Sequence, residues 1–249
     1  MIGFELTEDQ RMIRAAARDF AQSEIAPRAR EIDETDKFPA DIIAKMGALG
    51  LMGLPFPGAY GGAGADILSF ALALEEIAAA SGAVAITYNA HVSLGAMPIF
   101  LFGTEAQKQR WLAPLARGEG LGAFALTEPH AGSDAAALKT RATRQGDEWR
   151  INGQKMWITS GAVAQTIVLA AKTDPEAGTR GISNFIVPAD APGLTIGKDE
   201  PKMGMRGSPT NQLFFENCRI PAENLLGRLN DGFKQFMVTL DSARISIAA

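Results

Sequence analysis

A long stretch without charged residues places the strongest limit on how this chain can fold. Between Ile77 and Thr104 the sequence contains no Asp, Glu, Lys or Arg. A segment of this length could span a bilayer, but it lacks the flanking basic clusters of a membrane span. It also contains several polar residues and a proline, namely Ser81, Thr87, Asn89, His91, Ser93 and Pro98. The stretch therefore predicts a helix buried inside a helical domain.

Helix signals on both sides of this stretch extend the helical region over residues 1–120. Thr7 and Gln10 form a candidate capping box, and Thr104 and Gln107 form another. In such a box the hydroxyl and the amide satisfy two free N–H groups at the start of a helix. We therefore expect one helix to begin after Thr7 and another after Thr104.

After residue 120 the sequence changes to short segments with turn residues between them, which is typical of an antiparallel sandwich or barrel. Asn152-Gly153 predicts a hairpin turn, because both residues tolerate positive φ. Gln145-Gly146-Asp147 predicts a second turn. The expected strands cover residues 139–144, 149–151, 166–171, 182–187 and 212–215.

Together these patterns predict an α+β protein in three parts. Residues 1–120 form an all-helical domain, residues 121–229 an antiparallel β-sandwich or barrel domain, and residues 230–249 the first helix of an incomplete C-terminal helical bundle. The last helix reaches Ala249 with an apolar face and without a stop signal. We therefore expect the sequence to be a fragment of a longer protein.

Charge and cysteine content argue against several classes of function. The net charge is −4, the pI is about 5.3, and the 24 basic residues are scattered, so no nucleic-acid-binding surface is expected. Cys218 is the single cysteine, and the nearby Phe214, Phe215 and Ile220 indicate a buried, inert thiol. No group of His, Cys or carboxylate residues has the spacing of metal ligands. The N-terminus lacks the features of a signal peptide.

Two segments, residues 124–134 and 152–160, carry the residues best suited to chemistry. In Ala131-Gly132-Ser133, small side chains let the backbone approach a ligand. Successive amides and hydroxyls suit a phosphate or the polar edge of a ring. On spacing alone, a plain loop between strands explains the first segment equally well. A triad of Ser133, His130 and Asp134 is not expected, because triad groups come from distant positions.

In combination, the two segments resemble the flavin-binding middle domain of the acyl-CoA dehydrogenase family. The shared pattern is Ala-Leu-Thr-Glu-x-x-Ala-Gly-Ser-Asp over residues 125–134, then Asn-Gly-x-Lys-x-Trp-Ile-Thr over residues 152–159. The resemblance covers the whole chain. It implies FAD as the cofactor and dehydrogenation of an acyl-CoA thioester to a trans-2-enoyl-CoA, with electrons passed to an electron-transferring flavoprotein. It further implies a homotetramer at full length, without a membrane span, in the bacterial cytoplasm or the mitochondrial matrix.

The resemblance also assigns roles to individual residues around the flavin ring. It implies that Thr127 serves the polar edge of the ring and that Trp157 packs on its dimethylbenzene end. Ile158 and Thr159 would flank the reactive ring nitrogen, where Thr159 can donate a hydrogen bond. The remaining cofactor contacts implied are Phe124, Leu126, Gly132 and Ser133, of which Ser133 also reaches the pantetheine arm of the substrate. Thr179 would contact the nucleotide part of CoA.

The last helix carries a further pair, Asp241 and Arg244, whose spacing places them on one helical face. A surface ion pair explains them without a function, whereas the resemblance implies substrate contacts. Some relatives place the catalytic glutamate directly before this arginine, but here the residue is Ala243. No catalytic residue is therefore expected within this chain. The base would lie in a missing segment, so residues 1–249 alone should not turn over substrate.

Three other functions fit parts of the same pattern. An acyl-CoA oxidase would share the two segments but use oxygen as the electron acceptor. A flavin monooxygenase or nitroalkane oxidase on this scaffold would act on substrates without CoA. A non-enzymatic interaction module would bind no flavin. Neither the acyl chain length nor the electron acceptor follows from the sequence.

Overall fold

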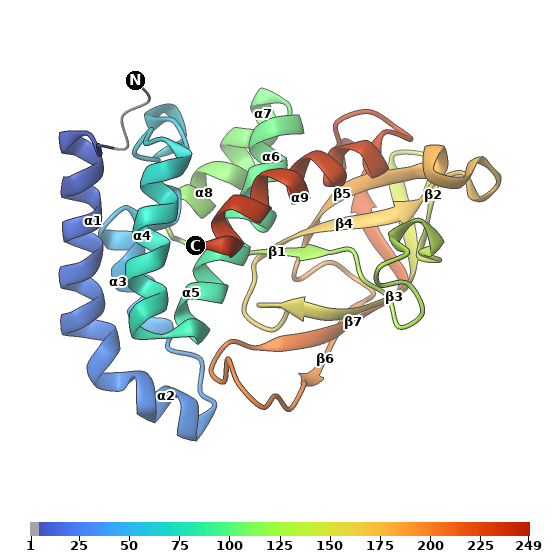
Figure 1. Ribbon diagram of the computed structural model, residues 1–249. Coiled ribbons are helices and arrows are strands. Elements are labelled where there is room, and N and C mark those ends of the chain that lie inside the picture. The colour runs from blue at the N-terminus through green and yellow to red at the C-terminus, as the bar shows by residue number, and fades with distance from the viewer. Residues whose placement is uncertain (1–4) are drawn as a thin grey trace.

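The computed structural model describes residues 5–249, and its first part is a layer of helices packed against a sheet (Figure 1). Both expected capping boxes are confirmed. The backbone N–H of Gln10 donates to Thr7 Oγ1, and the backbone N–H of Gln107 donates to Thr104 Oγ1, each over 3.2 Å. The α-helices of this part are α1 (Glu8–Phe20), α2 (Ala29–Thr35), α3 (Ala40–Ala48), α4 (Ile67–Ala80), α5 (Gly82–Asn89), α6 (Met97–Phe102), α7 (Glu105–Gln107) and α8 (Ala113–Ala116).

Most of the uncharged stretch, from Gly82 to Phe102, forms one continuous helix with a change of pitch in its middle; its first residues end α4, and the extended backbone of Ser81 separates the two helices. α5 leads into the π-helical segment η5 (Ala90–Ala96), which leads into α6. By length and composition, Gly82–Phe102 is apolar enough to cross a membrane, but 78% of its most apolar part is buried inside the fold. Core helices pass the same test, so the expected buried helix is confirmed.

The second part is a mainly antiparallel sheet with strand order β6-β7-β3-β2-β4-β5-β8, in which β1 pairs with β4 in parallel. Alternation along β4 sends Val168 toward the helical core and its neighbours Ile167 and Leu169 into a second core within the sheet. The strands are β1 (Gly122–Ala125), β2 (Arg141–Gln145), β3 (Glu148–Thr159), β4 (Thr166–Lys172), β5 (Ile182–Pro188), β6 (Leu194–Asp199), β7 (Thr210–Pro221) and β8 (Leu225–Leu226).

The expected hairpin turn at Asn152-Gly153 is wrong. Both residues lie inside β3, whose register with β7 shifts beside Gly153. Gly153 has φ +149°, and a Cβ there would lie 2.6 Å from the Cα atom of Thr140. A bulge therefore accounts for the glycine. The turn that joins β2 to β3 is the other expected one, at Gly146, where φ is +62°.

The loop after β6 connects the sheet to the helices. Its Gly207 amide N–H donates to Asp36 Oδ1 over 2.6 Å, at the end of α2. Its neighbour Ser208 shares a hydrogen bond of 2.9 Å with Thr87 on α5. Met205, with φ +54°, approaches Gly82 at the start of α5. This loop therefore ties the sheet domain to α2 and to the buried helix.

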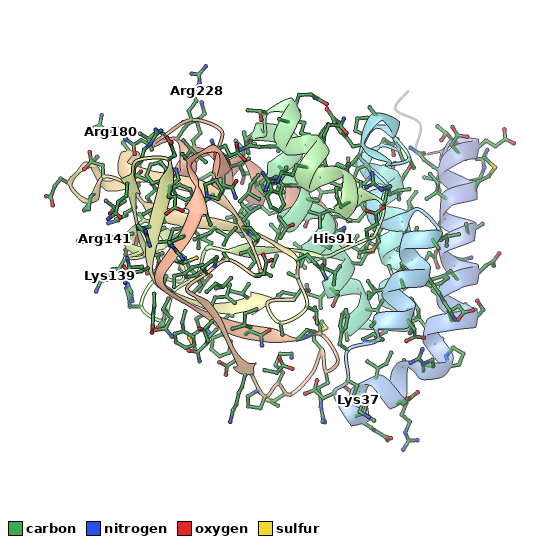
Figure 2. The ribbon with its side chains drawn as sticks, turned by 180° about the vertical axis from the view of Figure 1, so that it is seen from behind. Lys37, His91, Lys139, Arg141, Arg180 and Arg228 are labelled. Carbon is green, nitrogen blue, oxygen red and sulfur yellow. The ribbon has the colours of Figure 1, made fainter. Side chains whose placement is uncertain are left out.

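A second connection joins η5 to β1 in the middle of the molecule. His91 is fully buried there, and its Nδ1 accepts the Gly122 N–H over 3.0 Å; Figure 2 shows His91 between the helices and the sheet. A methyl group at Gly95 would overlap the backbone of Gly122. The helix and the strand therefore approach as closely as two glycines allow. The last helix, α9 (Gly232–Ala248), packs against η5 and β5 (Figure 1).

We predict that Gly95→Ala destabilises the protein by about 2–3 kcal/mol or more, because the added methyl must displace the backbone of β1. Gly58→Ala is the matched control, since a Cβ at Gly58 meets nothing within 4 Å. Urea unfolding of the two variants measures the difference. Equal free energies of unfolding would show that the contact between η5 and β1 is not tight.

We also predict that His91 makes the protein sensitive to mild acid. Burial lowers the pKa of His91 from 6.5 to about 4, although the carbonyls of Met52 and Leu115 favour the charged form. Between these two pH values the unfolded chain binds the additional proton and the folded protein does not, so stability falls as pH decreases from 6.5 to 4. The loss for this group is roughly 3 kcal/mol.

Urea unfolding at a series of pH values measures this slope. His91→Asn should flatten it between pH 6.5 and 5. An unchanged slope in His91→Asn would contradict the assignment.

Candidate active site

The two segments singled out from the sequence lie side by side in the structure. The Met156 amide N–H donates to the Thr127 carbonyl oxygen over 2.8 Å. After Thr127 the loop turns back on itself. The backbone N–H of Glu128 donates to the Ala131 carbonyl over 3.0 Å, and the backbone N–H of Ala131 donates to the Glu128 carbonyl over 3.1 Å. The loop after β1 therefore runs beside the end of β3, and the two chemical segments form one site.

A buried ion pair holds these segments together. Lys155 Nζ lies 2.8 Å from Glu128 Oε1, and the side chains are 0% and 2% exposed. The same Nζ donates to the Leu126 carbonyl over 2.9 Å. Glu128 in turn accepts the amide N–H groups of Lys139 and Thr140, over 2.6 and 3.0 Å. Each charge therefore has several hydrogen-bond partners, as a buried pair requires.

The surroundings of the pair shift both of its pKa values. Burial lowers the pKa of Lys155 to about 8, against the opposing charge of Glu128. Burial would raise the pKa of Glu128, but the Lys155 charge and the hydrogen bonds outweigh it and lower that pKa. Glu128 is therefore ionised at neutral pH. Neither residue was assigned a role from the sequence, although Glu128 in the first segment and the single base of the second, Lys155, were the available signal.

A cavity of about 200 Å³ opens at Leu126 and Thr127, which precede Glu128, and is called the central cavity below. Six of the residues expected to contact the flavin line it: Phe124, Leu126, Thr127, Trp157, Ile158 and Thr159. Three further lining residues were not expected from the sequence, namely Ala90 and Leu94 on η5 and Leu240 on α9. The cavity thus combines apolar walls with two threonines, and it lies where the helices, the sheet and α9 meet.

The backbone at the end of β3 directs Trp157 outward. Trp157 has φ +61° and is 54% exposed, and the register with β7 shifts between Lys155 and Ile158. Positive φ is rare for a bulky residue and costs on the order of 1–3 kcal/mol. Bulges of this kind re-aim side chains beside functional sites. The bulge presents the indole at the central cavity instead of burying it in the sheet.

The other expected site residues do not line the central cavity. Gly132 and Ser133 are exposed on the loop after Thr127, and a Cβ at Gly132 would meet nothing within 4 Å. Thr179 is exposed in the 3-10 segment η8 (Pro175–Gly181); its neighbour Arg180 lies at the outer end of the sheet domain (Figure 2). These positions leave open space next to the loop.

On α9, Asp241 and Arg244 form an exposed ion pair, with Asp241 Oδ1 3.5 Å from Arg244 Nε. Asp241 directly follows Leu240, which lines the central cavity. Ala243 is 7% exposed, so the position next to Arg244 is buried and apolar. Cys218 is fully buried, and burial raises the pKa of its thiol to about 11. The expectation of a buried thiol is confirmed.

A second cavity of about 190 Å³, called the distal cavity below, lies between α4, α5 and the end of α9. Its walls are mostly apolar, and the Met205 side chain contributes to one side. The lining residues are Leu74, Ala78, Gly82, Ala85, Ile86, Asn89, Met205 and residues 246–249. Asn89 and Ala90 are consecutive, so one helix contributes to both cavities.

A helical domain followed by a β domain, with a polar-edged cavity at their junction, defines a two-domain α+β ligand-binding scaffold. Family models of the acyl-CoA dehydrogenase N-terminal and middle domains match residues 7–119 and 123–218. The chain belongs to the acyl-CoA dehydrogenase family. The resemblance of the two segments to this family is therefore confirmed.

Individual relatives agree with the family models. The chain is 53% identical over 249 residues to a probable acyl-CoA dehydrogenase of Bacillus subtilis, covering 100% of this chain and 66% of the relative. Butyryl-CoA dehydrogenase from Megasphaera elsdenii superposes with a TM-score of 0.97 at 44% identity. The match covers 99% of this chain and 66% of that protein. An acyl-CoA dehydrogenase complexed with FAD, from Bacillus anthracis, superposes with a TM-score of 0.90 at 38% identity. The match covers 96% of this chain and 41% of that protein. The chain thus spans about two thirds of the length of the first two proteins.

We predict that Lys155→Met destabilises the protein by about 3–5 kcal/mol, because it leaves Glu128 charged and buried without its partner. Adding Glu128→Gln to Lys155→Met should restore a large part of that loss, since the uncompensated charge is removed. Lys139→Met, at an exposed lysine of the same loop, is the control and should have little effect. Chemical unfolding at pH 7 measures all three. A similar loss for Lys155→Met and Lys139→Met would contradict the role of the pair.

Proposed function

We propose that this chain forms the flavin-binding and acyl-binding part of an FAD-dependent acyl-CoA dehydrogenase, which converts an acyl-CoA thioester to a trans-2-enoyl-CoA. One observation carries the proposal: both family segments line a single cavity, with apolar side chains around two threonines. The butyryl-CoA dehydrogenase relative favours a short acyl chain.

The residues present fit FAD. The flavin ring is flat and apolar with one polar edge, and the central cavity offers Phe124, Leu126 and Trp157 for its faces and dimethylbenzene end, with Thr127 and Thr159 for its polar atoms. The exposed indole of Trp157, held outward at positive φ, suits a ligand that covers it. The open space beyond Gly132 suits the approach of the pyrophosphate. When bound, FAD supplies the acceptor for the substrate hydride.

In this proposal the chain positions the thioester and excludes water. Ile158 and Thr159 hold the reacting face, while Ala90, Leu94 and Leu240 close the apolar side of the central cavity. Ser133 binds the pantetheine arm, and Thr179 contacts the nucleotide part of CoA. Asp241 and Arg244 bind the adenine-pantetheine region. Their exposed ion pair contributes little to stability, so exchanging it for contacts with the substrate costs little.

The proton at the α-carbon needs a base from outside residues 1–249. Removal of this proton requires a positioned carboxylate, and Ala243 before Arg244 cannot accept one. We infer that the base lies in a C-terminal helical bundle that follows α9. We further infer electron transfer to an electron-transferring flavoprotein and a homotetramer at full length, in the bacterial cytoplasm or mitochondrial matrix. Domain limits at residues 120 and 229 are part of the same proposal.

The test is flavin bleaching by butyryl-CoA without oxygen. The intact protein, made with ample riboflavin, should be yellow, contain FAD and lose its colour when butyryl-CoA is added. Residues 1–249 alone should cause no dehydrogenation, because they lack the base. Turnover by residues 1–249 would contradict the missing base, and an intact protein without affinity for FAD would overturn the proposal. Rapid peroxide release in air would favour an oxidase instead.

A further inference from the structure

Both peptide groups that flank Thr127 are held by β3. Lys155 Nζ donates to the Leu126 carbonyl, in the peptide before Thr127, over 2.9 Å. The Met156 N–H donates to the Thr127 carbonyl, in the peptide after it, over 2.8 Å. Rotation of either peptide would break a hydrogen bond inside the protein, which is unfavourable. The backbone of Thr127 therefore has one orientation relative to the central cavity.

The N–H of Thr127 is the group that this arrangement leaves available for a ligand. In a trans peptide the C=O and the N–H point in opposite directions, so the Thr127 N–H points away from the Leu126 carbonyl and from Lys155. It has no hydrogen-bond acceptor among residues 5–249. Thr127 is partly exposed and lines the central cavity. A donor in this position suits the polar, electron-rich edge of a ligand.

The ammonium group behind this peptide strengthens the donor. Lys155 is fully buried, and the charge of Glu128, whose Oε1 lies 2.8 Å from Nζ, opposes the effect of burial on the Lys155 pKa. A cation bound to the carbonyl polarises the peptide, because consecutive hydrogen bonds strengthen one another at low dielectric. The Thr127 N–H is therefore a better donor than an amide whose carbonyl faces water.

We propose that Lys155 is a positioning residue for FAD, which directs the Thr127 N–H at the polar edge of the flavin ring and so raises the reduction potential of the cofactor. This inference rests on the proposed function, because it places that edge at Thr127. Hydrogen bonds to the ring tune its electronics. Reduction makes the ring richer in electrons, so a donor binds the reduced ring more tightly than the oxidised one. Lys155 acts only through the peptide, since its side chain is 0% exposed.

The experiment measures the reduction potential of bound FAD in the intact holoenzyme, without acyl-CoA, by titration against a redox dye. The test variant combines Glu128→Gln with Lys155→Met, which removes the donor to Leu126 and leaves no uncompensated charge. Relative to oxidised FAD, it should bind reduced FAD about 10-fold more weakly than the wild-type protein does, which lowers the potential by about 30 mV for a two-electron couple. Lys139→Met, at an exposed lysine of the same loop, is the control and should leave the potential unchanged.

The outcomes separate this role from a purely structural one and from the proposed function. A double variant that binds FAD with the wild-type potential would show that the pair serves the fold alone, and would overturn the role of Lys155. An intact wild-type protein that binds no FAD would overturn the proposed function instead. Should the double variant not retain FAD, Glu128→Gln alone decides the question. It keeps the donor to Leu126 and removes a negative charge, so a potential at or above the wild-type value supports the role of Lys155, and a lower one contradicts it.

Discussion

The site depends on one buried ion pair. Glu128 and Lys155 come from two segments that are separate in the sequence, and their side chains are almost completely buried. Their bonds reach the carbonyl of Leu126 and the amides of Lys139 and Thr140, so they fix the loop after β1 against the end of β3 and the start of β2. Thr127 and Trp157 lie within two residues of these charges. A charged pair costs more to bury than an apolar pair would, but its many hydrogen bonds define one relative position of the segments.

Close packing of backbone against backbone sets the opposite wall of the cavity. η5 approaches β1 at Gly95 and Gly122, where a side chain would not fit, and His91 bonds to the same strand. The π-helical pitch occurs in this contact region, and Ala90 and Leu94 of η5 face the central cavity. π-helical turns are often found at functional sites. The ion pair holds the two segments of the sheet domain together, and this contact holds η5 against β1.

Local signals predicted the elements of this fold better than the contacts between them. Capping boxes and the uncharged stretch depend only on neighbouring residues, and the structure agrees with both. Asn152-Gly153 gave a wrong prediction because tolerance of positive φ is common to turns and bulges, and only the neighbouring Thr140 distinguishes them. β6 was not expected, although Leu194, Thr195 and Ile196 alternate between apolar and polar side chains. Leu240 and the pairing of Glu128 with Lys155 depend on distant segments, so no spacing rule could reveal them.

The two cavities separate the tasks of the proposed enzyme along one helix. The central cavity is built from both domains and from rigid backbone, which suits the fixed geometry that a redox step requires. The distal cavity is built from helix side chains and a loop methionine, Met205, whose flexible side chain adapts to different neighbours. Side chains in the distal cavity can change without disturbing the ion pair or the contact of η5 with β1. Residues of the distal cavity can therefore vary while the geometry at the central cavity is retained.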